Sequence, residues 1–249
     1  MFQISENIIR IPSVDSTNNY AANLVKDGEI GLGTAIMADY QTGGRGQRGT
    51  TWHSPSGKNL LLSICLPGFQ LTFSNFFILS KWFAFQVSNH LNTEYGLKSE
   101  VKWPNDILIN GKKVAGTLIE SVMSGGKYTS HIIGVGLNVN QLEFPEDVNG
   151  TSLQIETKKV VAVQAVAQAL LQFLNSGIAL LELAQYDLIE QQYLDVLWNM
   201  GKRMVEDLKT NTVKELQVFG VNNQGELLAL DLANNSPCTY SMKEIRWLG

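Results

Sequence analysis

Two hydrophobic periods alternate along this chain. Runs of β-branched and apolar residues bounded by turn residues predict strands, and apolar residues three and four apart predict helices. Strands are expected at residues 8–14, 34–40, 59–66, 113–124 and 127–140, with two more around the turn in VKWPNDILING (residues 101–111). Helices are expected at residues 15–28 and 73–95, with a further pair in residues 158–198 that is broken near Gly177 or near Tyr186-Asp187.

Turn residues order these elements into a fold class. Asn110-Gly111 and Gly125-Gly126 favour tight hairpins. After Met200-Gly201 the pattern changes to short strands with Asn-Gln-Gly and Asn-Asn-Ser turns, which favours a small β barrel. We expect an α+β fold with a mixed, mostly antiparallel sheet and flanking helices. The expected domains are residues 1–200 and residues 201–249.

Composition narrows the class of protein. With 249 residues, 44% hydrophobic and 17% charged, the chain is long and apolar enough to bury a core, which excludes wholesale disorder. We find no apolar run of about 18 residues and no secretory signal, so we expect a cytoplasmic protein with no membrane span. Cys65 and Cys238 are therefore expected as free thiols rather than as a bridge. The net charge of −4 argues against a polyanion binder.

One long stretch of the chain lacks acidic residues. None lies between Asp39 and Glu94, and the same stretch carries Arg45, Arg48, Lys58 and Lys81. Absence of carboxylates around basic side chains suits an anionic ligand. The alternative is that the stretch is mostly core, as LLLSICL and FFILSKWFAF suggest.

A glycine-rich loop at residues 43–49 is the first candidate for chemistry. Its sequence GGRGQRG follows a predicted strand, and four glycines in seven residues let backbone N–H groups approach a ligand. Arg45 and Arg48 can donate forked hydrogen bonds to carboxylate or phosphate oxygens. The spacing fits neither a P-loop nor a dinucleotide-binding motif, and a mobile surface turn stays an alternative.

Two later segments add candidates. Lys113 enters an apolar strand beside Ala115 and Gly116, so it suits an anion ligand as well as a structural lysine, whereas Lys112 is expected to be a solvated hairpin charge. In GVGLNV (residues 134–139) the glycines at alternate positions face one side, where a ligand can lie against bare backbone, and Asn138 is expected to share that face. A β-bulge is the alternative there.

Together these motifs resemble the biotin protein ligases, that is, the biotin–[acetyl-CoA-carboxylase] ligases. The matching segments appear in the family's order and at close to its spacing, namely Asp15-Ser16-Thr17-Asn18, Gly44-Arg45-Gly46-Gln47-Arg48-Gly49, Lys102-Trp103-Pro104-Asn105-Asp106, Lys113-Val114-Ala115-Gly116 with Glu120, and Gly134-Val135-Gly136-Leu137-Asn138-Val139. The resemblance covers nearly the whole chain. It implies a catalytic domain related to class II synthetases and a small C-terminal barrel of SH3 type.

The resemblance also implies an activity. ATP and biotin would form biotinyl-5′-AMP with Mg²⁺ as cofactor, and a lysine of a biotin carboxyl carrier protein would then take the biotinyl group. DNA would not be a partner, because only about 7 residues precede the first predicted strand, too few for the helix-turn-helix that some members carry. A membrane would not be a partner either, because no apolar run is long enough to span one. A homodimer is left open.

Residue roles follow only from the resemblance. The implied biotin contacts are Ser16, Thr17, Asn18, Gln41, Gly44, Arg45, Gly46, Gln47, Lys113, Gly116, Gly134 and Gly136. The implied ATP contacts are Arg45, Arg48, Trp52, Asn105, Lys113 and Asn138, and the implied catalytic residues are Lys113, Arg45 and Asp106. Asp106 would either orient or deprotonate the amine or serve a metal, and no metal ligand is indicated. Ser16 and Thr17 also suit helix capping, and a role for Arg246 at the nucleotide is left open.

One departure and three alternatives accompany this hypothesis. Many members have an arginine where this chain has Gln47, so a charge near the reactive intermediate is missing. A lipoate or octanoate ligase of similar fold would need a longer apolar tunnel. A non-enzymatic binding module would need neither Lys113 nor the paired arginines. A DNA-binding repressor is disfavoured by the net charge and the short N-terminal segment.

Overall fold

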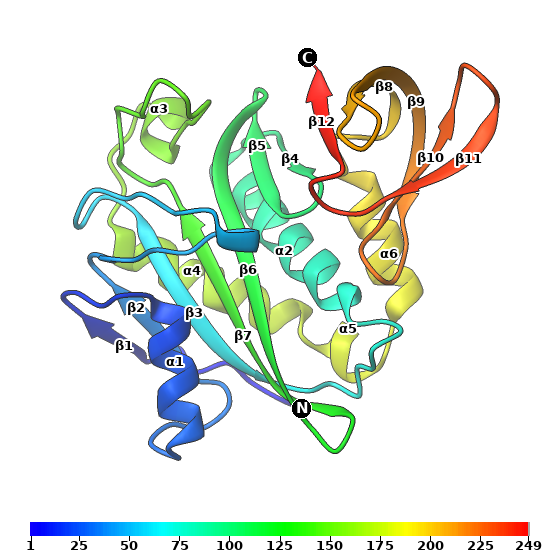
Figure 1. Cartoon of the computed structure of the whole chain (residues 1–249). Coiled ribbons are helices and arrows are strands. Elements are labelled where there is room, and N and C mark those ends of the chain that lie inside the picture. The colour runs from blue at the N-terminus through cyan, green and yellow to red at the C-terminus, as the bar shows by residue number, and fades with distance from the viewer. Residues whose placement is uncertain (249) are drawn as a thin grey trace.

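A seven-stranded sheet forms the centre of the molecule (Figure 1). The structure is a computed structural model that describes residues 1–248, without the side chain of Arg48. The strands are β1 (Ile8–Ile11), β2 (Ala35–Ala38), β3 (Leu60–Pro67), β4 (Ser99–Lys102), β5 (Asp106–Ile109), β6 (Lys112–Ser124) and β7 (Lys127–Leu137). Their order is β1-β2-β3-β7-β6-β5-β4, and only β1 and β2 pair in parallel. The sheet is therefore mixed and mostly antiparallel, as expected.

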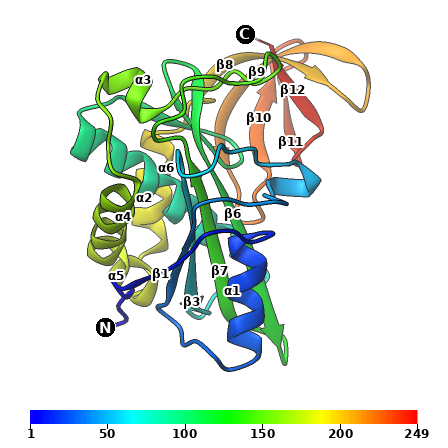
Figure 2. The same cartoon turned by 90° about the vertical axis from the view of Figure 1, so that its left-hand side faces the viewer.

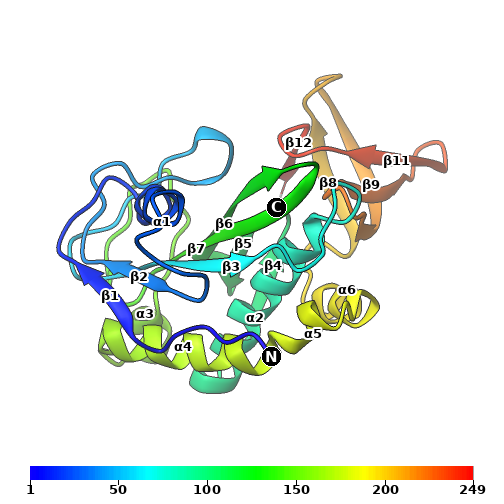
Figure 3. The same ribbon diagram turned by 90° about the horizontal axis from the view of Figure 1, so that it is seen from below.

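Helices cover both faces of this sheet unequally. Helix α1 (Thr17–Lys26) lies alone on one face, while α2 (Phe77–Tyr95), α4 (Val163–Gly177), α5 (Ala179–Glu182) and α6 (Tyr186–Asp195) lie on the other (Figures 2 and 3). Two short helices, η1 (Gln47–Gly49) and α3 (Leu153–Thr157), lie in connecting segments.

Strand β3 is buried on both faces of the sheet. Every residue from Leu60 to Leu66 is buried, as in a strand covered on both sides. Leu62 and Ile64 join the large core with α2 and α4, whereas Cys65, on the opposite side of the strand, packs with Ala21 of α1. The alternation of side chains in one strand thus separates the core from the face that carries α1.

A second sheet follows residue 200. It contains β8 (Gly201–Asp207), β9 (Thr212–Val221), β10 (Leu227–Asp231), β11 (Ser236–Tyr240) and β12 (Ile245–Leu248) in the order β11-β10-β9-β8-β12. All its pairings are antiparallel, which is compatible with the expected SH3-like barrel. The division into residues 1–200 and 201–249 stays a prediction.

The second sheet packs closely against the first unit. Val205 and Leu216 share one apolar cluster with Phe77 of α2 and with Trp103. The Trp103 Nε1 donates to the carbonyl of Gly225 at 3.0 Å. The segment that leads into the second sheet also pairs with edge strand β4, because residue 198 donates its N–H to the Val101 carbonyl. Residues far apart in sequence, such as Trp103 and Gly225, thus join the two units at the edge of the main sheet.

Most predicted elements are found, with shifted ends. The strand predicted at residues 8–14 stops at Ile11, and the helix predicted from residue 73 begins at Phe77. Helix α3 was not predicted. The helical region breaks at both suggested places, after Gly177 and before Tyr186. The hairpin predictions are confirmed: positive φ angles occur at Asn110 and Gly111 (52° and 73°) and at Gly125 and Gly126 (57° and 77°).

Two expectations drawn from composition can be compared with the structure, and one of them is confirmed. Both cysteines are free, and burial raises the pKa of Cys65 to about 11. We expected no apolar run long enough to span a membrane, and this expectation needs a correction. Val163–Glu182 is a helical stretch of 20 residues that is long and apolar enough, with a mean hydropathy of 1.3 over its most apolar window. Its Val166, Leu170 and Leu174 belong to the main core, as in a core helix.

Candidate active site

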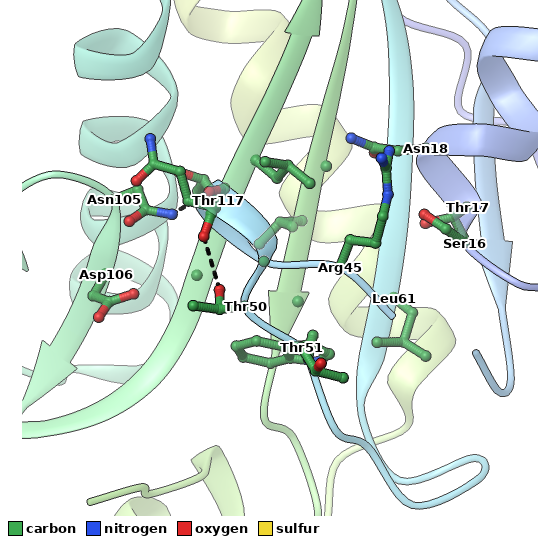
Figure 4. A pocket seen from close by; sticks show the side chains of 18 of the residues that line it. Ser16, Thr17, Asn18, Arg45, Thr50, Thr51, Leu61, Asn105, Asp106 and Thr117 are labelled. Atoms are coloured by element: carbon green, nitrogen blue, oxygen red, sulfur yellow. Dashed lines mark hydrogen bonds between the residues drawn. The ribbon is translucent and has the colours of Figure 1, made fainter. Parts of the chain in front are cut away.

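One cavity of about 260 Å³ lies on the face of the sheet that carries α1 (Figure 4). Its walls come from the first turn of α1, the glycine-rich loop, strands β3, β6 and β7, and the turn before β5. It gathers most of the residues predicted from sequence, namely Ser16, Thr17, Asn18, Gln41, Arg45, Gly46, Gln47, Trp52, Asn105, Asp106, Lys113, Gly116, Gly134 and Gly136. Segments more than 100 residues apart in sequence thus form one site.

A hydrogen-bonded row of polar side chains forms one wall. Gln41 Oε1 accepts from the N–H of Thr17 at 2.8 Å and from its hydroxyl at 3.0 Å. The hydroxyl of Ser63 lies 2.8 Å from Thr17 Oγ1 and 2.6 Å from Asn18 Oδ1. All but Gln41 are buried. The row fixes the positions of polar groups before any ligand binds.

The start of α1 is held from outside the helix. Ser16 is the N-cap residue, yet its side chain makes no capping hydrogen bond, and Gln41 satisfies the N–H of Thr17 instead. A hydrogen bond from Asn19 is the main cause that lowers the pKa of the neighbouring Asp15. Helix capping therefore does not use the Ser16 hydroxyl, which lies at the cavity.

The glycine-rich loop folds back as a narrow hairpin. Trp52 N–H donates to the Gly44 carbonyl at 2.9 Å, Gly46 N–H donates to the Thr50 carbonyl at 2.7 Å, and Arg45 pairs with Thr51 between them. A Cβ on Gly44 would stand 2.4 Å from the Trp52 carbonyl, so this glycine is required by the hairpin itself. The backbone pairing holds Arg45 and Gln47 at the cavity.

Trp52 covers the bare backbone of the two central strands. A Cβ at Gly136 would stand 2.4 Å from its ring, and one at Gly116 would stand 3.3 Å from it. Its Nε1 is buried and has no hydrogen-bond partner among the described residues. The glycines at alternate positions therefore make room for an aromatic ring, and the buried donor of that ring is left without a partner among the described residues.

Two of the cations that line the cavity, Lys113 and Arg45, have a carboxylate partner, and Lys243 is a third cation there. Lys113 Nζ lies 2.5 Å from Asp106 Oδ1 and 5.4 Å from the centre of the Trp52 ring. Arg45 Nη2 lies 2.5 Å from Glu120 Oε2. All four charged side chains are between 29% and 41% exposed, so water screens these pairs in part. An anion that enters can reach both cations.

The KWPND segment is fixed by its backbone. The peptide between Trp103 and Pro104 is cis, and Trp103 N–H donates to Asn199 Oδ1 at 2.8 Å. Asn105 Nδ2 donates to the Thr117 carbonyl at 2.6 Å, and the N–H of Thr117 donates back to the Asn105 carbonyl at 3.0 Å. Asp106 is consequently held opposite Lys113 by paired strands.

Some predicted site residues do not line the cavity. Asn138 follows the end of β7, and its Nδ2 donates to the Thr151 carbonyl at 3.0 Å, so it does not share the face of the glycines as expected. Gly44 is part of the loop hairpin and does not line the cavity. Arg246 forms an ion pair with Glu206 on the second sheet. The side chain of Arg48 lies outside the described residues.

The cavity also contains residues that sequence reasoning missed, namely Thr50, Thr51, Leu61, Leu62, Pro104, Thr117, Leu118, Val135, Met242 and Lys243. Four of them, Thr51, Pro104, Thr117 and Val135, directly adjoin predicted residues, and sequence adjacency was the available signal for those. Met242 and Lys243 come from the turn before β12, and no local pattern in the sequence connects that turn with the cavity.

Metal-binding side chains are sparse in the described part of the chain. No group of three or more His, Cys, Asp or Glu side chains there is arranged to hold a metal ion. Asp106 is the carboxylate that lines the cavity, and it faces Lys113. Such a site suits Mg²⁺ that arrives with phosphate oxygens and keeps its waters, because that ion needs only one or two carboxylates.

The fold and the cavity together define a class of protein. It is an α+β domain whose cavity is surrounded by a fixed polar wall, a glycine-rich hairpin and the cations Arg45 and Lys113. Such a cavity suits a polar, anionic ligand. The sequence model of the biotin/lipoate A/B protein ligase family matches residues 10–138, just over half of the chain. The chain belongs to this family.

Curated relatives agree with this assignment. The bifunctional ligase/repressor BirA of Bacillus spizizenii is 34% identical over 176 residues, which are 68% of this chain and 53% of that protein. The biotin–[acetyl-CoA-carboxylase] ligase of Paracoccus denitrificans is 37% identical over 130 residues, 50% of this chain and 51% of that protein. The chain thus spans about half the length of the curated relatives it matches.

A solved structure matches nearly the whole chain. The biotin protein ligase from Aquifex aeolicus in complex with biotin and ATP superposes with a TM-score of 0.78 at 26% identity, and the match covers 98% of this chain and 99% of that one. Both sheets of the present structure are therefore included in the shared architecture.

Proposed function

We propose that this chain is an ATP-dependent biotin protein ligase that forms biotinyl-5′-AMP and transfers the biotinyl group to a lysine of a biotin carboxyl carrier protein. The observation that carries the proposal is the cavity itself. Fixed hydrogen-bonding groups of Thr17, Asn18 and Gln41 line the same small cavity as the cations Arg45 and Lys113. A polar ring system with an anionic tail is the ligand that this arrangement suits.

In the first step, a carboxylate oxygen of biotin forms a bond to the α-phosphorus of ATP. The bond from that phosphorus to the bridging oxygen breaks, and pyrophosphate leaves. Two anions must meet, so the cations Lys113 and Arg45 neutralise charge as it develops on the phosphate oxygens. Trp52, whose ring already lies flat on the sheet, would cover the adenine, and the hairpin would close the site against water.

In the second step, the lysine amine of the carrier forms a bond to the acyl carbon, the bond from that carbon to the AMP oxygen breaks, and the nitrogen loses a proton. Asp106 lies at the cavity beside Asn105 and is the available carboxylate to orient the amine and accept that proton. Positioning of two bound groups supplies much of the remaining acceleration.

The roles proposed for other residues follow from where they lie. Ser16, Thr17, Asn18 and Gln41 would hold the head of biotin, and Gly116, Gly134 and Gly136 would form the wall behind it. Asp106, the carboxylate that lines the cavity, would help to hold a Mg²⁺ ion, which would supply positive charge to the ATP phosphates. We place the reaction in the cytoplasm, consistent with two free thiols.

The experiment is pyrophosphate exchange into ATP, measured with biotin, lipoate or octanoate in turn, followed by biotin transfer to an isolated carrier domain. We expect exchange with biotin and label on one lysine of the carrier. Because the family includes lipoate ligases, the competing acids are the essential comparison. Exchange driven by lipoate or octanoate, and not by biotin, would contradict the proposal.

A further inference from the structure

Glu120 is a charged group beside the cavity to which the proposed chemistry gives no role. It lies on β6 and does not line the cavity. Its Oε2 accepts hydrogen bonds from Arg45 Nη2 at 2.5 Å and from Asn18 Nδ2 at 3.0 Å. A carboxylate next to a site for two anions repels both of them. Its presence there is favourable only if it has a compensating effect, such as orienting a neighbouring cation.

The bond from Asn18 fixes this carboxylate in place. Asn18 is 3% exposed, and its Oδ1 lies 2.6 Å from the Ser63 hydroxyl. Its amide fits only because Gly134 has no side chain, since a Cβ there would stand 2.3 Å from Asn18 Oδ1. Both halves of the Asn18 amide are thus engaged, so its Nδ2 is directed at Glu120 by the buried wall of the site.

Arg45, in contrast, comes from a surface loop and has a long side chain with many rotamers. Figure 4 shows it reaching from the loop to the side of Asn18. Its contact with Glu120 uses Nη2. A guanidinium has five N–H donors in a rigid fork, so holding one edge fixes the directions of the others.

We propose that Glu120 is a positioning residue: with Asn18 it holds the guanidinium of Arg45 in the orientation that receives the carboxylate of biotin and the α-phosphate. Glu120 touches neither reacting group and acts through Arg45. The inference rests on the proposed function, because it needs an anionic substrate at Arg45. As a partly exposed pair, Arg45 and Glu120 add little to folding stability, so their effect lies in ligand binding and in rate.

A double-mutant cycle tests this role. Glu120→Ala, Arg45→Ala and the double variant are compared with the parent in biotin-dependent pyrophosphate exchange. Glu120→Ala should lower kcat/KM for biotin by about tenfold, a coupling expected for residues in direct contact. In the Arg45→Ala background the same change should alter kcat/KM by less than about twofold, because the residue through which Glu120 acts is gone.

A matched pair supplies the control. Arg10 and Asp39 form a comparable exposed ion pair at 2.8 Å on β1 and the end of β2, and neither lines the cavity. Asp39→Asn should keep the parent's kcat/KM. Glu120→Gln, which keeps an acceptor oxygen for Asn18 but loses the charge, should fall between parent and Glu120→Ala, and it replaces Glu120→Ala in the cycle if that variant does not fold.

The outcomes of this experiment separate failure of the proposed function from failure of the positioning role of Glu120. If the parent shows no exchange with biotin, the proposed function fails. If the parent is active and Glu120→Ala retains its kcat/KM, or if the losses from the two single changes multiply in the double variant, the positioning role is wrong. Equal melting temperatures across the set exclude a loss caused by unfolding.

Discussion

At the scale of single residues, the cavity presents cations that already have counter-ions. Lys113 faces Asp106 and Arg45 faces Glu120, each at 2.5 Å. Partial exposure keeps these pairs weak, so an incoming anion replaces or shares them at small cost. The carboxylates also keep two cations ordered in a site where they would otherwise repel each other. Under the proposed function, such pre-ordered charges lower the barrier because they need little reorganisation during the reaction.

Lys113→Ala should damage adenylate formation far more than folding. Loss of a charge that stabilises the developing phosphate oxyanion costs about 3–4 kcal/mol of barrier, a rate loss on the order of a hundred- to thousandfold. Single-turnover formation of biotinyl-adenylate measures it. Lys112→Ala is the control, because Lys112 is exposed on the adjoining hairpin and does not line the cavity. Near-parent rates in Lys113→Ala would make this lysine structural.

At the scale of elements, the glycine-rich segment is a paired hairpin rather than a simple turn. Backbone hydrogen bonds from the Trp52 N–H to the Gly44 carbonyl and from the Gly46 N–H to the Thr50 carbonyl hold it, and the short helix η1 forms its tip. Gln47 begins that tip and lines the cavity. Closure of the loop over an intermediate therefore depends on side-chain contacts at the tip, where this chain offers an amide.

Substitution of Gln47 should change how well the intermediate is retained. A hydrogen bond from neutral Gln47 to the charged phosphate adds about 1.5–3 kcal/mol, and an arginine there would add its own positive charge to the contact. Gln47→Arg should therefore lower the escape of biotinyl-adenylate, and Gln47→Gly should raise it. Biotin label on bystander lysines of an unrelated protein measures escape. Parent-level label in both variants would mean that Gln47 does not touch the intermediate.

At the scale of the whole molecule, a buried charge joins the two units. Lys81 of α2 is fully buried; its Nζ donates to the Val221 carbonyl of β9 at 2.5 Å and forms an ion pair with Glu190 of α6. Burial is the main cause that lowers the pKa of Lys81. One side chain therefore ties the main core to the second sheet, which in turn brings Met242 and Lys243 to the cavity.

Lys81→Ala should destabilise the whole protein. Removing one partner of a buried pair costs about 3–5 kcal/mol, and we expect the lower end because Glu190 is partly exposed. Lys81→Met fills the same space without the charge and should lose less. Urea unfolding measures both, with exposed Lys98→Ala expected within about 0.5 kcal/mol of the parent. An unchanged midpoint in Lys81→Ala would rule out a stabilising role for this contact.

Local chemistry accounts for much of what could be predicted. The hairpins at Asn110-Gly111 and Gly125-Gly126 need positive φ angles, and these residues adopt them readily, so the sequence was sufficient there. The apolar periods predicted the sheet class and the two long helical regions. The ordered motifs predicted most of the cavity residues that we singled out, because a motif such as Lys102 to Asp106 contains a strand end together with the turn that follows it. Element ends were shifted, since packing rather than propensity sets them.

Only the tertiary structure decided which groups meet. Asn138 lies at a strand end, where the side-chain alternation stops, so its amide turns to Thr151 instead of following the glycines. Glu120 reaches Arg45 across 75 positions, and Met242 arrives from a second sheet. By itself the sequence determined local conformation, because that depends on neighbours in the chain, and it determined which reactive side chains are present. Long-range packing decided their pairing, because a contact between distant residues leaves no mark in local hydrophobic periodicity.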